Sequence, residues 1–92
     1  MRIIKDPTFN EEFKVILRFI ALDSKPRAIN FKNELISKVN DLPYMPYKYR
    51  KSHYFLDDNI RDYIFKGYVI PYRVDIDENT LSILGIIKYK DK

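Results

Sequence analysis

Basic and aromatic side chains alternate along residues 44–54, a stretch without a single acidic residue. Lysine and arginine contact phosphate oxygens, and tyrosine rings stack on unpaired bases, so this composition suits the binding of a nucleic acid. The candidate target-binding residues in this stretch are Lys48, Arg50, Lys51 and His53. Histidine is a common general base at neutral pH, so His53 is also a candidate for that role. A structural interpretation stays open, because Tyr and Pro in a loop can also cover the apolar edge of a small sheet.

Further cations lie on the strands that the sequence predicts and at the end of the chain. Arg61 and Arg73 are expected on the uncovered face of a sheet, where each could contact a phosphate or a partner. Lys88, Tyr89 and Lys90 form a basic and aromatic end that could hold single-stranded RNA. The alternatives are strand charges paired with nearby aspartates and a solvated terminus.

The remaining composition excludes several kinds of chemistry. The chain has 92 residues, with 17 Lys and Arg against 13 Asp and Glu, and a formal net charge of +4. The absence of Cys excludes thiol catalysis, disulfides and Cys-ligated zinc, and one His argues against a His-based metal site. Two Gly cannot build a glycine-rich phosphate loop. We therefore expect a single domain over residues 1–92, with no metal and no small-molecule cofactor.

Membrane association is not expected either. No apolar run approaches the roughly 20 residues that a membrane-spanning helix needs. The first six residues, Met1 to Asp6, lack the apolar core of a signal peptide. These features predict a cytoplasmic protein without a membrane partner.

Two helices are predicted after a short strand at residues 2–5. Asp6-Pro7 is a typical helix start, and apolar residues then recur every three or four positions as far as Leu22. A second helix is predicted to begin with Asp23 or Ser24 as its cap and Pro26 in its first turn, and it should end at Pro43. Because the connection is short, the two helices should form an antiparallel hairpin.

The second half of the chain is predicted to be stranded. Residues 43–59 resemble a loop, and strands are expected at 60–66, 68–76 and 81–87. Pro71 conflicts with a regular interior strand, so we expect a bulge or an unpaired N–H position there. The predicted order is β-α-α-β-β-β, an α+β fold in which a helical hairpin covers one face of a small, mainly antiparallel sheet.

The order of the predicted elements, the length of the chain and several short sequence motifs resemble those of the RelE/ParE superfamily of toxins from type II toxin–antitoxin modules. The resemblance extends over nearly the whole chain and depends on an ordered set of short stretches. In chain order these are Pro7-Thr8-Phe9 with Glu12, Ile16 and Ile20; Pro26 to Phe31 with Leu35, Ile36, Val39 and Leu42-Pro43; Pro46 to Arg50; Ile60-Arg61; Gly67-Tyr68; Ile70 to Val74; and Leu81 to Ile87.

The resemblance implies a toxin that arrests growth and is neutralised by a cognate antitoxin. RelE-like members cleave mRNA on the ribosome, whereas ParE-like members poison DNA gyrase, and both targets stay open here. Under the nuclease hypothesis the candidate catalytic residues are Arg61, Arg73 and Lys88. The antitoxin is expected to cover the outer helix face and an exposed strand edge.

The chain departs from the sequence pattern of the nuclease members at two places. Nuclease members often carry Arg directly after the Gly-Tyr pair, where this chain has Val69. Many members also end the last strand with a His-x-Arg-like group, where this chain reads Lys88-Tyr89-Lys90. RNA cleavage needs a group that activates the 2′-hydroxyl and a cation that stabilises the charge at phosphorus. The alternative hypothesis is a non-catalytic module of the same fold that binds RNA or protein, or a degenerate toxin.

Overall fold

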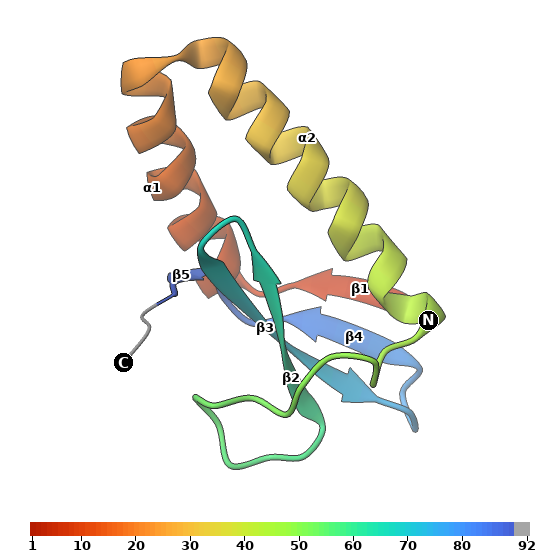
Figure 1. The fold of residues 1–92 in the computed structure, drawn as a ribbon. Coiled ribbons are helices and arrows are strands. Elements are labelled where there is room, and N and C mark those ends of the chain that lie inside the picture. The colour runs from red at the N-terminus through yellow and green to blue at the C-terminus, as the bar shows by residue number, and fades with distance from the viewer. Residues whose placement is uncertain (90–92) are drawn as a thin grey trace.

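The computed structural model describes residues 1–89 as two helices packed on a five-stranded sheet (Figure 1). The elements follow the predicted order, except that the last predicted strand is divided. They are β1 (Arg2–Lys5), α1 (Pro7–Asp23), α2 (Lys25–Asp41), a 3₁₀ turn (Leu42–Tyr44), β2 (Ile60–Phe65), β3 (Tyr68–Asp75), β4 (Thr80–Ile83) and β5 (Ile87–Lys88).

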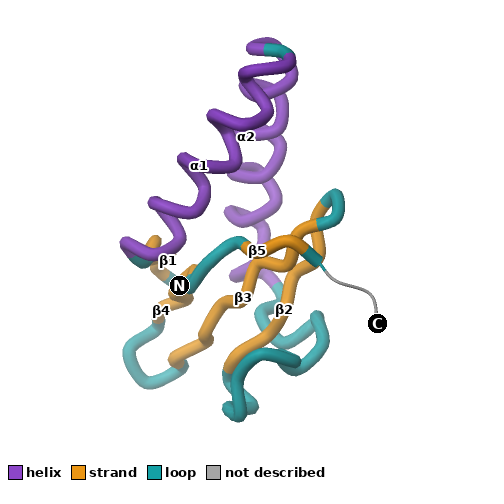
Figure 2. Tube along the Cα trace, turned by 90° about the vertical axis from the view of Figure 1, so that its left-hand side faces the viewer, coloured by secondary structure: helices purple, strands orange, loops and turns teal. Residues whose placement is uncertain are grey.

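Both helices begin at the caps that the sequence predicts. The side chain of Asp6 accepts a hydrogen bond from the Thr8 backbone N–H at 2.8 Å, and the Ser24 hydroxyl accepts one from the Arg27 N–H at 3.2 Å. Each cap satisfies an N–H that the first turn of a helix leaves without a partner. Ser24 alone separates the helices, so they form the expected antiparallel hairpin. The closed end of this hairpin extends well beyond the sheet (Figures 1 and 2).

The sheet has the order β1-β4-β3-β2, with β5 also pairing with β3. Its pairs are antiparallel, apart from β1, which runs parallel to β4. Lys66 and Gly67 connect β2 to β3, both with positive φ angles (48° and 83°), which suits a tight two-residue hairpin turn. That turn sets the register, with Phe65 opposite Tyr68 and Arg61 opposite Tyr72.

The prediction of one continuous last strand over residues 81–87 is wrong. β4 ends at Ile83, and β5 begins only at Ile87. The interruption lies beside Pro71, whose carbonyl oxygen accepts a hydrogen bond from the Leu84 N–H at 2.9 Å. Since proline has no N–H to donate, a regular partner strand would leave an acceptor unpaired there. The predicted irregularity at Pro71 therefore occurs in the neighbouring strand.

Glu12 of α1 stabilises this interruption. Its Oε1 accepts a hydrogen bond from the Ile86 N–H at 3.0 Å, and Ile86 itself is buried. A Cβ atom at Gly85 would lie only 2.7 Å from the same oxygen, so a larger residue there would displace the Glu12 carboxylate from its present position.

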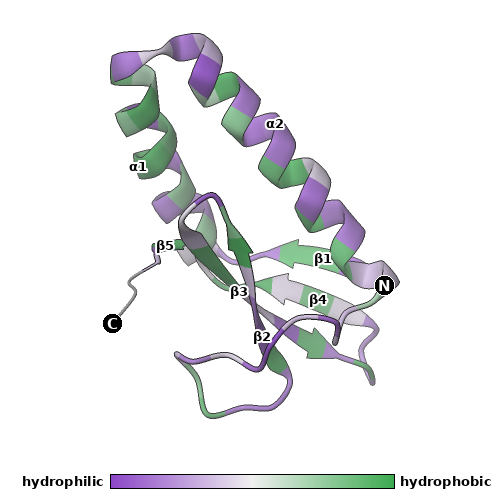
Figure 3. Ribbon diagram, in the orientation of Figure 1, coloured by the Kyte–Doolittle hydropathy of each residue, from purple (hydrophilic) through white to green (hydrophobic). Residues whose placement is uncertain are grey.

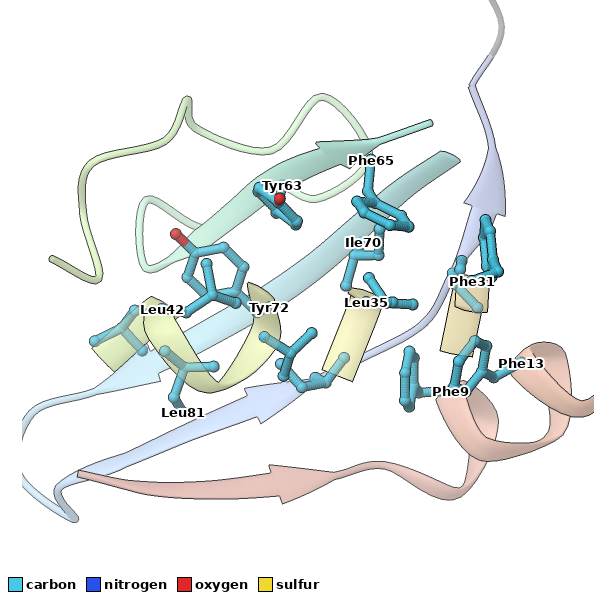
Figure 4. Close-up of a cluster of buried hydrophobic side chains, with 14 residues drawn as sticks. Phe9, Phe13, Phe31, Leu35, Leu42, Tyr63, Phe65, Ile70, Tyr72 and Leu81 are labelled. Carbon is cyan, nitrogen blue, oxygen red and sulfur yellow. The ribbon is translucent and has the colours of Figure 1, made fainter. Parts of the chain in front are cut away.

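The core lies between the helical hairpin and one face of the sheet (Figures 3 and 4). Aromatic rings form much of it, with Phe31 of α2 in edge contact with Phe65 of β2 at a centroid distance of 5.3 Å. On β3, Ile70, Tyr72 and Val74 point into this core. The residues between them, among them Arg73, therefore point to the opposite face, which the helices do not cover.

Candidate target-binding surface

The loop from Met45 to Asn59 is attached to the sheet largely through Arg61. Its guanidinium donates to the carbonyl oxygens of Tyr47, Tyr49 and Asp58, each at 3.1 Å, and lies 4.8 Å from the centre of the Tyr47 ring. The expectation that Arg61 lies on the uncovered face is wrong. The two-residue hairpin pairs it with Tyr72, so it shares the helix-covered side of the sheet. Its hydrogen bonds indicate a structural role in ordering the loop.

Tyr72 makes a second attachment for the same loop. Its buried hydroxyl donates to the carbonyl oxygen of Pro46 at 2.6 Å. Burial raises the pKa of Tyr72 well above its usual value, and the charges of Tyr49 and Asp62 act in the same direction, while Arg61 opposes them. Burial also raises the pKa of Tyr63. Both phenols therefore keep their protons at neutral pH, and neither is suited to act as a base.

Residues 50–52 extend the sheet beyond the edge of β2. The Asp62 N–H donates to the Arg50 carbonyl at 3.0 Å, and the Ser52 N–H donates to the Ile60 carbonyl at 2.9 Å. Lys51 bridges Arg61 in antiparallel fashion, and its ammonium lies 3.5 Å from the exposed Asp58 carboxylate. Part of the predicted binding stretch thus acts as an additional edge segment.

On the uncovered face, the Arg50 side chain contacts both β2 and Tyr89. Its Nη2 donates to Asp62 Oδ2 at 3.2 Å, and its guanidinium carbon lies 5.8 Å from the centre of the Tyr89 ring. Asp62 is only 1% exposed, and the same Oδ2 accepts the His53 backbone N–H at 3.0 Å. Arg73 is exposed on this face of β3, as predicted. We call Arg50, His53, Arg73 and Tyr89 the open-face surface.

The other predicted site residues lie elsewhere. Lys88 pairs with Tyr68 across the β3–β5 ladder, and its ammonium lies 5.7 Å from the centre of that ring, on the helix-covered side. Lys48 lies beside Tyr49 and helps to line a groove of about 360 Å³ near the end of α2. Lys90 lies outside the described residues. The candidate catalytic cations Arg61, Arg73 and Lys88 therefore divide between the two faces of the sheet.

Two features with functional potential were not predicted. One is Asp62, although strand alternation already places it between the apolar Ile60 and Ile64 on one face. The other is an exposed apolar stripe of Val15, Phe19 and Leu22 on α1, which are 59%, 71% and 87% exposed. Their spacing of four and three residues would have revealed a second apolar face on this helix.

Residues 1–89 contain no group of three or more His, Asp or Glu side chains that could hold a metal ion. In the same range, neither helix is long and apolar enough to span a membrane.

Comparison with known proteins identifies the family. The model of the ParE toxin of the type II toxin–antitoxin system parDE matches residues 3–92. None of the curated proteins matches the chain by sequence at a significant level. A solved structure of the chromosomal ParDE toxin–antitoxin system from P. aeruginosa has the same fold, with a TM-score of 0.80 at 16% identity over 98% of this chain and 97% of that chain. Since the family model extends over nearly the whole sequence, this chain belongs to the ParE toxins of type II toxin–antitoxin systems.

Proposed function

We propose that this toxin arrests growth by binding and inhibiting an enzyme that acts on DNA, with DNA gyrase as the first candidate, rather than by cleaving mRNA. The observation that supports this proposal is the separation of the three candidate catalytic cations. Arg73 is on the uncovered face of the sheet, whereas Arg61 and Lys88 are on the helix-covered side.

RNA cleavage would need these groups to converge on one phosphate. A general base and a charge-stabilising cation must both lie within about 3 Å of the reacting atoms. The Arg61 guanidinium already donates to three loop carbonyls, and Lys88 lies over the Tyr68 ring. Val69, at the position where nuclease relatives often carry Arg, is fully buried. This arrangement favours inhibition by binding.

The open-face surface is the proposed contact with the target. It combines two cations, Arg50 and Arg73, with the partly exposed ring of Tyr89 and the exposed His53. Arginine and tyrosine are enriched where protein partners bind, because each combines a large contact area with directed hydrogen bonds. Arg73 is the most direct probe, since it is exposed and lies in the middle of the sheet.

Neutralisation by an antitoxin is proposed to use the other side of the molecule. Val15, Phe19 and Leu22 form an exposed apolar stripe on α1. The end of this helix that meets α2 extends beyond the sheet (Figure 2). Such a stripe is uncommon on a protein that acts alone and suits an amphipathic helix of a partner. The antitoxin would then cover α1 and leave the fold of the toxin unchanged.

Induced expression without an antitoxin tests the function directly. We expect growth to stop, gyrase-linked breaks to accumulate on supercoiled plasmid, and mRNA 5′ ends to stay as in uninduced cells. Arg73→Ala should relieve the arrest, whereas the control Arg18→Ala, an exposed arginine on α1, should leave it unchanged. New mRNA 5′ ends without gyrase-linked breaks would establish cleavage and overturn the proposal. Normal growth would instead favour a degenerate toxin or a non-catalytic binding module.

A further inference from the structure

Asp62 is an unusual residue for a fully buried position in a small sheet. It is 1% exposed and lies on the face opposite the helices, outside the main hydrophobic core. Burying a carboxylate is unfavourable unless hydrogen bonds and an opposite charge compensate for the lost hydration. An apolar residue at this position could pack at least as stably, so the carboxylate calls for an explanation beyond stability.

The contacts of Asp62 all lead to one segment of the loop. Its Oδ2 accepts hydrogen bonds from Arg50 Nη2 at 3.2 Å and from the His53 backbone N–H at 3.0 Å. Its own N–H donates to the Arg50 carbonyl at 3.0 Å. One residue thus determines both the path of the backbone between Arg50 and His53 and the direction of the Arg50 side chain.

Arg50 then connects this segment to Tyr89, which follows β5. Its guanidinium lies between the Asp62 carboxylate and the Tyr89 ring, whose centre is 5.8 Å away. The backbone of Tyr89 is attached separately, because its N–H donates to the Gly67 carbonyl at 2.8 Å. Residues 50, 62 and 89 are far apart in sequence but form one continuous row on the uncovered face.

The Arg50–Asp62 pair also retains unused hydrogen-bonding capacity. Within the described residues, Arg50 Nε and Asp62 Oδ1 are both buried and have no hydrogen-bond partner. Nε and Nη2 form one edge of the guanidinium, the edge that can bind both oxygens of a carboxylate. The pair therefore forms one of the two hydrogen bonds that a two-point contact between a guanidinium and a carboxylate provides.

We propose that Asp62 is a positioning residue, which aligns residues 50–53 and, through Arg50, the Tyr89 ring into one surface for the toxin's target. The role rests on the proposed function of the open-face surface, but the alignment itself is a property of the isolated protein. Asp62 does not touch the target, since its side chain is covered by Arg50 and the loop.

Amide hydrogen exchange of the full chain tests the alignment without reference to toxicity. Asp62→Asn keeps an oxygen for the His53 N–H but removes the charge that holds Arg50. Loss of the Arg50–Tyr89 contact should accelerate exchange of the Tyr89 amide about twofold to fivefold, the range that corresponds to a cation–π contact at an exposed site. Asp58→Asn is the matched control, because Asp58 is in an exposed pair with Lys51 in the same loop. It should leave Tyr89 unchanged.

The exchange pattern separates positioning from general stability. If Asp62 contributed only to stability, the slowest amides of β3 would accelerate in Asp62→Asn, while Tyr89, which exchanges by local opening, would not. That result would overturn the proposal. Should Asp62→Asn fail to fold, Tyr89→Leu provides the reciprocal measurement, since coupling between two sites acts equally in both directions. Faster exchange at His53 is expected there, and unchanged exchange at His53 would contradict the alignment.

Growth arrest then links the alignment to function. At equal levels of soluble protein, Asp62→Asn should relieve growth arrest about as strongly as Arg50→Ala, while Asp58→Asn remains fully toxic. Full toxicity of Asp62→Asn, with altered exchange at Tyr89, would show that the alignment exists but does not serve the target. If the unaltered chain causes no arrest, the proposed function fails, whereas the exchange result still decides the alignment.

Discussion

Tyr72 joins the centre of the sheet to the loop that precedes β2 through one hydrogen bond. The residue is fully buried, and its hydroxyl donates to the Pro46 carbonyl at 2.6 Å, across 26 positions in sequence. Tyr72→Phe removes only this hydroxyl and keeps the ring that packs in the core. The substitution therefore isolates the contribution of a single polar contact between the sheet and the loop.

The expected loss of stability follows from the burial of both groups. A net intramolecular hydrogen bond contributes about 1 kcal/mol, and an acceptor left unpaired in a partly buried position adds to the loss, so we expect about 1–2 kcal/mol in total. For a domain of this size, each 1 kcal/mol corresponds to a fall in Tm of roughly 4–8 °C. Thermal and urea denaturation at neutral pH measure both quantities.

Alkaline pH supplies a second measurement with a defined sign. Because burial raises the pKa of Tyr72, the folded chain keeps this proton at a pH where the unfolded chain loses it. The free energy of unfolding should therefore fall as pH rises above about 10, with a contribution from Tyr72 approaching about 1.4 kcal/mol per pH unit. Tyr72→Phe lacks this contribution, whereas Tyr63, whose pKa is also raised, contributes equally in both proteins.

The two measurements together can refute the reasoning. Wild type should be more stable than Tyr72→Phe at pH 7, and its advantage should shrink above pH 10. Equal stability at pH 7 would mean that the Pro46 carbonyl finds another partner and that the hydroxyl does not hold the loop. If the free energy of unfolding fell equally steeply above pH 10 in both proteins, Tyr72 would lose its proton at the same pH in the folded and the unfolded chain. That result would contradict the pKa that burial raises.

Three further predictions concern other parts of the molecule. Glu12→Ala should destabilise the fold by about 1–3 kcal/mol in urea denaturation, because it leaves the buried Ile86 N–H unpaired, and Glu12→Gln should recover much of the loss. Arg61→Lys should keep the charge but lose the three-carbonyl contact, so limited proteolysis should cut the loop before β2 faster than in wild type, and an unchanged rate would refute the structural role. Phe19→Ser combined with Leu22→Ser should leave Tm within a few degrees, because both side chains are largely exposed, but should weaken antitoxin binding in calorimetry at least tenfold; an unchanged affinity would place the antitoxin elsewhere.

Local sequence signals were sufficient for most of the elements. Asp6 directly precedes Pro7 and caps the first helix as predicted. Asp23 and Ser24 were both candidates for the cap of the second helix, and Ser24 is the one that forms it. Alternation in residues 68–76 predicted a strand with Ile70, Tyr72 and Val74 on one face, and these residues point into the core, although the strand itself ends at Asp75. Such features depend on neighbours within a few positions, which the sequence displays directly.

The division of the last strand could be predicted only in part. Pro71 predicted an irregularity in its own strand, β3. The interruption occurs instead between β4 and β5, because that segment lies beside Pro71 and would have paired with the N–H that proline lacks. The stabilising contact comes from Glu12, which is 74 positions away from Ile86. No local pattern around residues 84–86 contains that information.

Strand register was needed to assign the cations to the two faces of the sheet. Strand alternation relates residues along one strand, but the assignment of Arg61 to a face also needed its pairing with Tyr72. The two-residue turn at Lys66 and Gly67 could have supplied this register. It places Phe65 opposite Tyr68 and thereby determines every other pair between β2 and β3.

By itself, the sequence determined the order of elements, the helix boundaries, the exclusion of thiol chemistry and the resemblance to the toxin superfamily, because each depends on composition or on short-range spacing. Only the tertiary structure decided what the basic residues do. Arg61 orders a loop, Lys88 lies on the helix-covered side, and Arg50 joins Asp62 to Tyr89. Charged side chains acquire such roles from partners that folding brings close from distant positions, and these partners leave no periodic pattern in the chain.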